Sequence, residues 1–275
     1  MIMRCRLYIL TLITGIICAA CIKEDRSGCP CYLHVDLSGV DGYYIHNLDL
    51  MMDQGSGHPV QWTAVDETLF GDTLIIPVNK AEFDFCAWGN LGSSVLDQSG
   101  RIISPGQIQD SLWSDSHHIN TRCEDAYVSV VPERQYIPVT IIIRGMLSGI
   151  SSLSPELDNV SDRLSFNGRA TGSRVRYKAV LVEGPDSGHG YYLFKTMMLT
   201  QATATDATLN LDFTRDGRPL RNTFPLGQIL SDIGEDISKT GRNPVVIDLT
   251  IGTASIYLTV QVNDWVTHGV FAINF

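Results

Sequence analysis

The amino-acid sequence predicts an all-β protein built from two antiparallel β-sandwich domains in tandem, with few short helices. Most of the chain consists of short segments that are rich in β-branched and aromatic residues and bounded by Gly, Asp, Asn or Pro. Helical periodicity is almost absent, and strands at this regular spacing are typical of antiparallel sandwiches. A polar segment at 131–136 (VPERQY), which contains Pro132, separates two sets of strands. We therefore predict domains at 32–131 and 132–275.

The first domain begins with a segment that alternates cleanly between apolar and polar residues. Leu33, Val35 and Leu37 share one face, while His34 and Asp36 share the other. An extended chain points successive side chains to opposite faces of a sheet, so this pattern predicts a half-buried strand. Strands are expected at 32–37, 43–52, 60–65, 73–78, 82–88 and 126–131, and single helical turns at 91–96 and 108–113.

The second domain shows the same kind of pattern and one helical segment. Strands are expected at 137–144, 174–182, 191–199, 207–213, 245–251 and 255–262. In the segment 174–182, Val180 and Val182 interrupt a polar side that otherwise alternates well. A helix is predicted over 226–237, because apolar residues recur there at helical spacing, although two glycines lower its propensity. These apolar residues are Leu226, Ile229, Leu230, Ile233 and Ile237.

The start of the chain carries the pattern of an export signal. A short basic beginning is followed by the uncharged apolar segment 7–18. Its length fits the core of a secretory signal and is too short for a membrane span. Ala19 and Ala20 then precede Cys21, and a small-small-Cys ending resembles the lipobox of bacterial lipoproteins, in which the cysteine is diacylated before cleavage.

We therefore predict that residues 1–20 are removed, that Cys21 carries the lipid, and that 21–31 form a lipidated tether. The protein would then be anchored to a membrane without crossing it. Cys18 departs from the lipobox pattern, which usually has Leu, Val or Ala three residues before the cut. The alternative is an ordinary signal peptide followed by an unrelated cysteine.

The charge balance argues against a nucleic-acid partner. The chain has 275 residues and a formal net charge of −10. Removal of residues 1–20, whose only charges are Arg4 and Arg6, would change the net charge to −12. An acidic body lacks the basic surface that nucleic acids require and is repelled by anionic lipid. Attachment to the membrane would therefore depend on the lipid chains.

Four cysteines would remain in the folded part of a mature lipoprotein: Cys29, Cys31, Cys86 and Cys123. In an oxidising compartment they are candidates for two disulfides, with three connectivities open. Cys29-Pro30-Cys31 has one spacer residue where the redox motif has two, and no second pair at zinc spacing follows. Disulfides or buried thiols are therefore favoured over a redox or metal site.

No catalytic motif stands out. The chain lacks G-x-S-x-G, a Walker-type loop and H-E-x-x-H, so we expect no enzyme activity, cofactor or metal. A carboxylate pair for glycoside hydrolysis depends on a separation in space that a sequence does not give. His117 and His118 are adjacent, and we expect them in a solvated loop. The segment 212–217 (DFTRDG) lacks the last acid of a calcium loop and favours a hairpin turn.

Exposed aromatic residues leave a glycan-binding function open, because such rings stack on sugar faces. The tryptophans are Trp62, Trp88, Trp113 and Trp265. Trp88 lies in an apolar run and Trp265 follows a strand, so core positions are expected for both. Trp113, expected in a polar loop, is the best candidate for a functional tryptophan. Coplanar exposed rings would favour glycan binding, and an unpaired sheet edge would favour assembly with another protein.

Three passages together resemble the Bacteroidales FimB-type fimbrial anchor lipoproteins of type V pili. One is the segment 21–37 (CIKEDRSGCPCYLHVDL), with acids after Cys21 and Cys29-Pro30 before an alternating strand. The others are 83–90 (FDFCAWGN) and 259–265 (TVQVNDW). The resemblance implies two transthyretin-like sandwiches, outer-membrane attachment through Cys21 with exposure at the cell surface, and a fimbrial shaft subunit as partner. It also implies that the protein anchors the shaft and limits its length without catalysis or a cofactor.

Strand donation is the expected mode of contact, because a sheet edge exposes backbone groups that a partner's strand can pair with. The last segment is apolar and uncharged, and we expect it to be either the final strand of the second domain or a strand donated to a neighbouring subunit. It consists of Gly269, Val270, Phe271, Ala272, Ile273, Asn274 and Phe275. The main alternative function is a surface lipoprotein that binds glycans.

Overall fold

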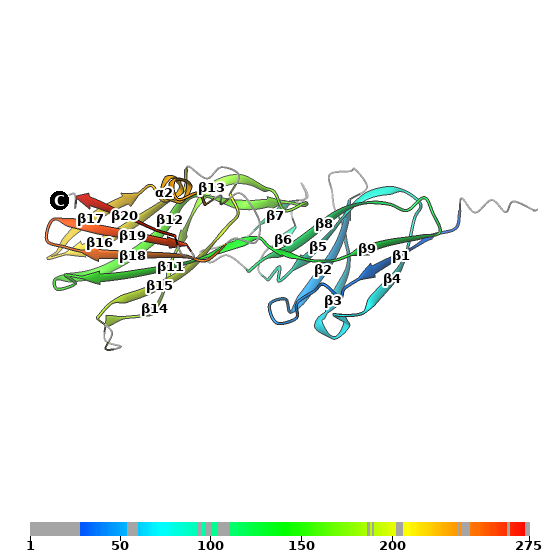
Figure 1. Ribbon diagram of the computed structural model, residues 1–275, viewed down its shortest axis with the longest axis horizontal. Helices are drawn as coiled ribbons and strands as arrows, with labels where there is room; N and C mark the ends of the chain where they lie inside the picture. The colour runs from blue at the N-terminus through cyan, green and yellow to red at the C-terminus, as the bar shows by residue number, and fades with distance from the viewer. Residues whose placement is uncertain are drawn as a thin grey trace, which may run out of the picture.

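The structure is a computed structural model that describes residues 28–53, 60–92, 95–96, 101–103, 111–185, 188, 190–201, 206–235, 237, 243–262 and 265–272. The predicted signal and Cys21 lie outside the described residues, as do Ile273–Phe275. The molecule is elongated, with strand β1 near one end and the last strand, β20, finishing near the other (Figure 1). The order of the strands in the sequence therefore broadly follows the long axis of the molecule, from β1 at one end to β20 at the other.

The first half of the chain forms two sheets that enclose a core. A three-stranded sheet has the order β4-β1-β9, and a five-stranded sheet has the order β10-β8-β5-β2-β3. Apolar residues from both sheets, among them Leu33, Leu50 and Phe85, make up one buried cluster. The elements are β1 (Cys31–Asp36), β2 (Asn47–Asp53), β3 (Val60–Asp66), the 3-10 turn η1 (Glu67–Leu69), β4 (Thr73–Val78), β5 (Glu82–Gly89), β8 (Trp113–Asn120), β9 (Asp125–Ser129) and β10 (Glu133–Arg134).

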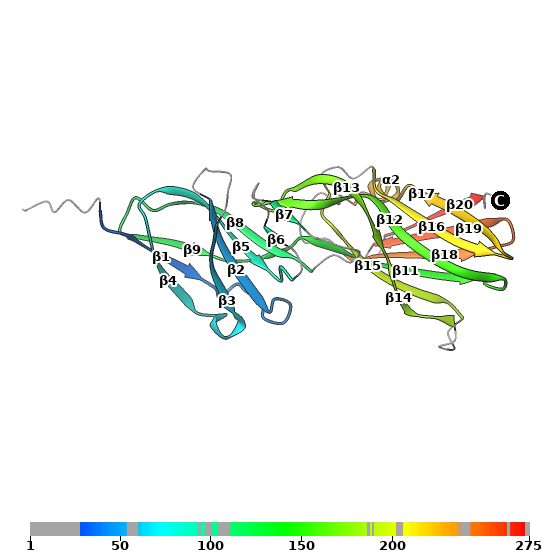
Figure 2. The ribbon, with the colours of Figure 1, turned by 180° about the vertical axis from the view of Figure 1, so that it is seen from behind.

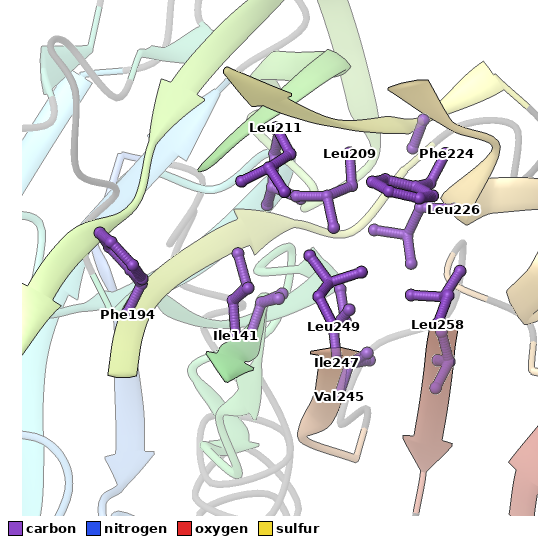
Figure 3. Close-up of a cluster of buried hydrophobic side chains, with 14 of the residues drawn as sticks. Ile141, Phe194, Leu209, Leu211, Phe224, Leu226, Val245, Ile247, Leu249 and Leu258 are labelled. Atoms are coloured by element: carbon purple, nitrogen blue, oxygen red, sulfur yellow. The ribbon is translucent and has the colours of Figure 1, made fainter. Parts of the chain in front are cut away.

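The second half forms a larger sandwich. One sheet has the order β14-β15-β11-β18-β19-β20, and the other has the order β17-β16-β12-β7-β6, with β13 also paired to β12. Figure 3 shows Ile141, Ile247 and Leu258 of the first sheet facing Leu209 and Leu211 of the second. The elements are β11 (Tyr136–Gly145), β12 (Ile150–Ser165), β13 (Ala170–Lys178), β14 (Val180–Glu183), β15 (Tyr192–Leu199), β16 (Thr208–Arg215), β17 (Arg218–Phe224), α2 (Leu226–Asp232), β18 (Val245–Ile251), β19 (Ser255–Val262) and β20 (Trp265–Ala272).

The all-β prediction is confirmed, but the sheets are not purely antiparallel. In the first half β1 pairs antiparallel with β4 and parallel with β9. In the second half β11 pairs antiparallel with β15 and parallel with β18. The opening strand of each half therefore lies between an antiparallel and a parallel neighbour. A parallel pair needs a long crossover, and periodicity within one strand carries no information on that pairing.

The two halves meet through a third buried cluster. Strand β5 is buried on both faces: Phe85 and Ala87 face the first core, whereas Cys86 and Trp88 contact Leu164 of the second half within the junction cluster. The Trp88 indole Nε1 also donates a hydrogen bond to the Phe166 carbonyl oxygen, at 3.2 Å. A strand buried on both faces is apolar at consecutive positions, which explains the run at 83–88.

Two short strands from the first half of the sequence also join a sheet of the second half. Strand β7 (Arg101–Ile103) pairs antiparallel with the end of β12, and β6 (Val95–Leu96) pairs with β7. The predicted division at residue 132 remains a prediction, and this hairpin shows that the first half contributes backbone to the second. Figure 2 shows β6 and β7 between the two sandwiches.

Most predicted strands are present, and β18 and β19 have the predicted bounds. The predicted strand at 174–182 is instead divided into β13 and β14, at the point where Val180 breaks the alternation. The helix is confirmed as α2, which ends at Asp232 rather than at 237. The turn at 212–217 is a hairpin, in which Arg215 pairs with Arg218. Strands β8, β12 and β17 were not predicted, because their sequences are polar or irregular.

Candidate functional site

Two thiols meet at the end of the molecule where β1 begins. The backbone N–H of Tyr32, next to Cys31, donates a hydrogen bond to the Glu124 carbonyl oxygen at 2.8 Å. The parallel pairing of β1 with β9 thereby brings Cys31 beside Cys123, and the two thiols share a hydrogen bond. Cys31 is fully buried and Cys123 is exposed. Burial raises the pKa of the Cys31 thiol, and the neighbouring Cys123 thiol raises it further.

The remaining two cysteines lie elsewhere. Cys86 is fully buried in the junction cluster, on the opposite face of β5 from the core that contains Cys31. Burial raises its pKa well above the usual value for a thiol. Cys29 is exposed, and all four cysteines are free thiols. No described cysteine shares the side of the sheet that carries Cys86, so its position agrees with the buried-thiol alternative, and the disulfide pairing of the four cysteines remains a prediction.

The opposite end of the molecule carries an edge strand whose outer face is exposed. Strand β20 pairs antiparallel with β19 along its length and is the last strand of its sheet. In β19 the alternate residues Ile256, Leu258 and Val260 are buried, whereas the β20 residues Val266 and His268 are exposed. Val266 and His268 pair with Gln261 and Thr259 of β19, so they extend the outer face of the sheet to its edge.

The predicted C-terminal segment lies partly in this strand. Gly269–Ala272 pairs with Ser255–Leu258 of β19, so these residues belong to the chain's own sheet. This agrees with the expectation of a final strand in the second domain. Ile273, Asn274 and Phe275 lie outside the described residues. Donation of this segment to another subunit remains a prediction.

A second sheet edge was missed in the sequence. Strand β14 borders the same six-stranded sheet on its other side, and Val180, Leu181 and Val182 are all exposed there. The signal was present in the sequence, because Val180 and Val182 interrupt the polar side of 174–182. An exposed apolar edge strand is a template for pairing with another chain.

The histidines and tryptophans fall into ordinary structural positions. His117 and His118 lie in strand β8 rather than in a loop, and each contacts a carboxylate, at 2.9 Å for His117–Asp115 and 2.8 Å for His118–Asp84. The expectation of a solvated loop is wrong, because the polar sequence of β8 conceals a strand with one exposed face. Within the described ranges no group of three or more His, Cys, Asp or Glu side chains is placed to hold a metal.

Trp88 is fully buried, whereas Trp113 is partly exposed at the start of β8 and not in a loop. The side chains of Trp62 and Trp265 are outside the described part of the structure. No helix in the described part of the chain is long and apolar enough to span a membrane.

The fold is similar to that of the fimbrial anchor protein Mfa2 from Porphyromonas gingivalis, with a TM-score of 0.62 and 12% sequence identity over 88% of this chain and 100% of that chain. It is also similar to a candidate adhesin and a candidate polysaccharide-binding protein, both from Bacteroides thetaiotaomicron. The adhesin gives a TM-score of 0.57 at 13% identity over 90% of this chain and 99% of its own. The polysaccharide-binding candidate gives a TM-score of 0.58 at 11% identity, over 87% of this chain and 98% of its own. No curated protein matches the chain at a significant level.

Identities this low establish the fold alone, and the family model decides the classification. The model of the fimbrillin-A associated anchor proteins Mfa1 and Mfa2 matches residues 29–270. The chain belongs to this family. The resemblance to Bacteroidales fimbrial anchors inferred from the sequence is thereby confirmed. The matched residues span both sandwiches, from β1 near one end of the molecule to most of β20 near the other.

Proposed function

We propose that this protein is a non-enzymatic outer-membrane lipoprotein that anchors a fimbrial fibre at the cell surface. The observation that carries the proposal is the match of the fimbrillin-A associated anchor family over residues 29–270. The similar fold of a protein named as the fimbrial anchor of Porphyromonas gingivalis supports it. The lipobox-like ending at Cys21 supplies the attachment to the membrane.

The elongated shape suits a link between a membrane and a fibre. Strand β1 follows the predicted tether and lies near one end, whereas β20 finishes near the other (Figure 1). A pull on the fibre would pass through the sandwiches to the tether by way of β1. Six consecutive residues of β1 pair with β4 on one side and five pair with β9 on the other, which holds this strand inside its sheet.

A disulfide between Cys31 and Cys123 would reinforce this end. The two thiols already share a hydrogen bond across the β1–β9 pair. Oxidation would join the two sulfur atoms and release two protons and two electrons, which a disulfide oxidoreductase of the cell envelope would accept by thiol–disulfide exchange. The bridge would tie the first strand covalently to β9 beside the tether.

Strand β20 is the proposed contact with the fimbrial shaft subunit. It is an edge strand, and its described side chains are at least partly exposed. Such a strand can leave its sheet and pair with a neighbouring subunit through the backbone groups that now pair with β19. The core residues Ile256, Leu258 and Val260 belong to β19 and would stay in the sheet.

Deletion of residues 269–275 tests the donation. The shortened protein should stay folded and lipidated but fail to bind the shaft subunit, and cells should lose surface fibres by electron microscopy. The matched variant Cys21→Ser should bind the subunit normally while releasing fibres from the cell. Unfolding of the shortened protein would contradict donation, and normal fibre anchoring by both variants would contradict the anchor role.

A further inference from the structure

Aromatic side chains gather on the surface where the two sandwiches meet. Tyr43 and Tyr44, in the loop before β2, are 79% and 52% exposed. The Tyr44 ring stacks on Trp113, with ring centres 5.7 Å apart and an interplanar angle of 28°. The Tyr43 ring meets Tyr44 edge to face at 4.7 Å. Rings in mutual contact lose little freedom when a ligand binds, so they form a rigid exposed surface.

Two hydrogen-bond donors beside these rings have no partner. Trp113 and Arg134 are opposite each other in the β8–β10 pair. The Trp113 Nε1 and Arg134 Nε atoms are both enclosed, yet neither donates a hydrogen bond to any described residue. Because these two atoms have no accessible surface, a ligand would meet the exposed parts of Trp113 and Arg134 and not these N–H groups.

A groove continues from the rings onto the outer face of the second sandwich. Arg134 lies over the Tyr136 ring, at 5.5 Å from its centre, and Tyr136 lines a groove of about 540 Å³. Burial raises the pKa of the Tyr136 phenol, and the Tyr44 phenol contributes to the rise because the two groups lie near each other. Arg134 therefore connects the groove to the rings, because it lies over Tyr136 and is opposite Trp113. The volume of the groove lies in the range of ligand sites.

The groove wall combines apolar and hydrogen-bonding groups. The apolar residues are Pro138, Val139, Val180, Val182 and Met197, and the residues with hydroxyl groups are Ser111, Tyr136, Thr140 and Thr196. Lys195 is the one charged residue that lines the groove, and no described side chain forms an ion pair with it. Sugars present apolar C–H faces and hydroxyl edges together, and an acidic sugar adds a negative charge.

We propose that this aromatic groove, formed by Tyr43, Tyr44, Trp113 and Tyr136 with Arg134 and Lys195, binds an oligosaccharide that carries an acidic substituent. Sugar rings stack on the exposed tyrosines, and the sugar hydroxyls form hydrogen bonds with Ser111, Tyr136 and Thr140 of the groove wall. The acidic group lies toward Lys195. This activity is independent of fibre anchoring, and it would let an anchored protein hold a polysaccharide at the same cell surface.

The test is binding of the purified mature protein to an array of neutral, uronic-acid, sialylated and sulfated oligosaccharides, followed by calorimetry with the best acidic one. Tyr44→Ala should weaken binding by about tenfold, equivalent to the loss of one good stacking contact. Tyr257→Ala is the matched control, because Tyr257 is 53% exposed on β19, does not line the groove and should leave binding unchanged. Lys195→Gln should weaken binding of the acidic ligand and leave binding of its neutral analogue unchanged.

Tyr43→Ala separates a binding role from a structural one. Tyr43 is 79% exposed, so its removal should not lower the stability of the free protein. The affinity of the variant for the oligosaccharide should fall severalfold, because a stacking surface is lost. The proposal is overturned if the wild-type protein binds no array glycan better than Tyr44→Ala does. It is also overturned if Tyr44→Ala abolishes capture of the fimbrial subunit instead, which would make the rings a protein interface.

Discussion

A disulfide between Cys31 and Cys123 should raise the free energy of unfolding by more than any surface contact at that end of the molecule does. A bridge between them would close a loop of about 90 residues, for which the chain-entropy relation gives roughly 4.6 kcal/mol. Measured values usually fall below this limit, so we expect about 2–4 kcal/mol. For a protein of this size that corresponds to a rise of roughly 5–15 °C in the melting temperature.

The assay is thermal and urea unfolding of the purified protein with and without a phosphine reductant, together with peptide mapping of the unreduced chain. The mapping should recover a peptide that links Cys31 to Cys123. Reduction and Cys123→Ser should lower the melting temperature equally, whereas Cys29→Ser, at an exposed thiol, should have no effect. Equal melting temperatures with and without reductant, and no linked peptide, would refute the reasoning.

Four further outcomes follow from the structure. Trp88→Ala empties a fully buried site in the junction cluster and should cost about 3–5 kcal/mol, measured by urea unfolding. Asp36 accepts hydrogen bonds from the Ser38 amide at 2.9 Å and from the Ser129 hydroxyl at 3.1 Å, and the Ser38 bonds lower its carboxyl pKa most. The stability that this carboxylate contributes is present above its pKa in the unfolded chain, near 4, and is lost as the pH falls through its lower pKa in the folded protein. Asp36→Asn should therefore reduce the difference between the urea midpoints measured at pH 7 and at pH 2. Gly145→Ala should cost about 3 kcal/mol, because its φ is 98° and a Cβ would collide with the Ile251 carbonyl; Gly217→Ala, with a φ of 77° and open space, should cost only about 1 kcal/mol. Deletion of 269–275 removes the pairing of Gly269–Ala272 with the edge of β19 and should leave the second sandwich folded, measured by thermal unfolding.

The sequence predicts the strands that have one buried and one exposed face. Leu33, Val35 and Leu37 alternate along the chain and are all fully buried in the structure. Strand β12 escapes such a prediction because it runs over 16 residues with shifts in register against β13 and β16, so its apolar residues lose their regular spacing. Strand β8 was not predicted because its sequence is polar at most positions, including the buried Ser114, so apolar and polar residues do not alternate along it.

The candidate sites depend on contacts between distant parts of the chain, and local patterns do not specify these. Cys31 meets Cys123 only because β1 pairs parallel with β9. Tyr44 meets Trp113 only because their elements converge at the junction of the two sandwiches. Trp113 itself was identifiable as an aromatic residue in a polar setting. Its partners and its unpaired Nε1 required the fold.

The most direct test of the anchor role is crosslinking in outer membranes from fimbriated cells. A photo-reactive residue placed at His268, exposed on β20, should capture the fimbrial shaft subunit, identified by mass spectrometry. The same residue at Tyr127, 75% exposed on β9 in the first sandwich, should not. Capture of the shaft subunit at position 268 alone is the predicted result. Capture at neither position while intact fibres remain on the cells would contradict the account.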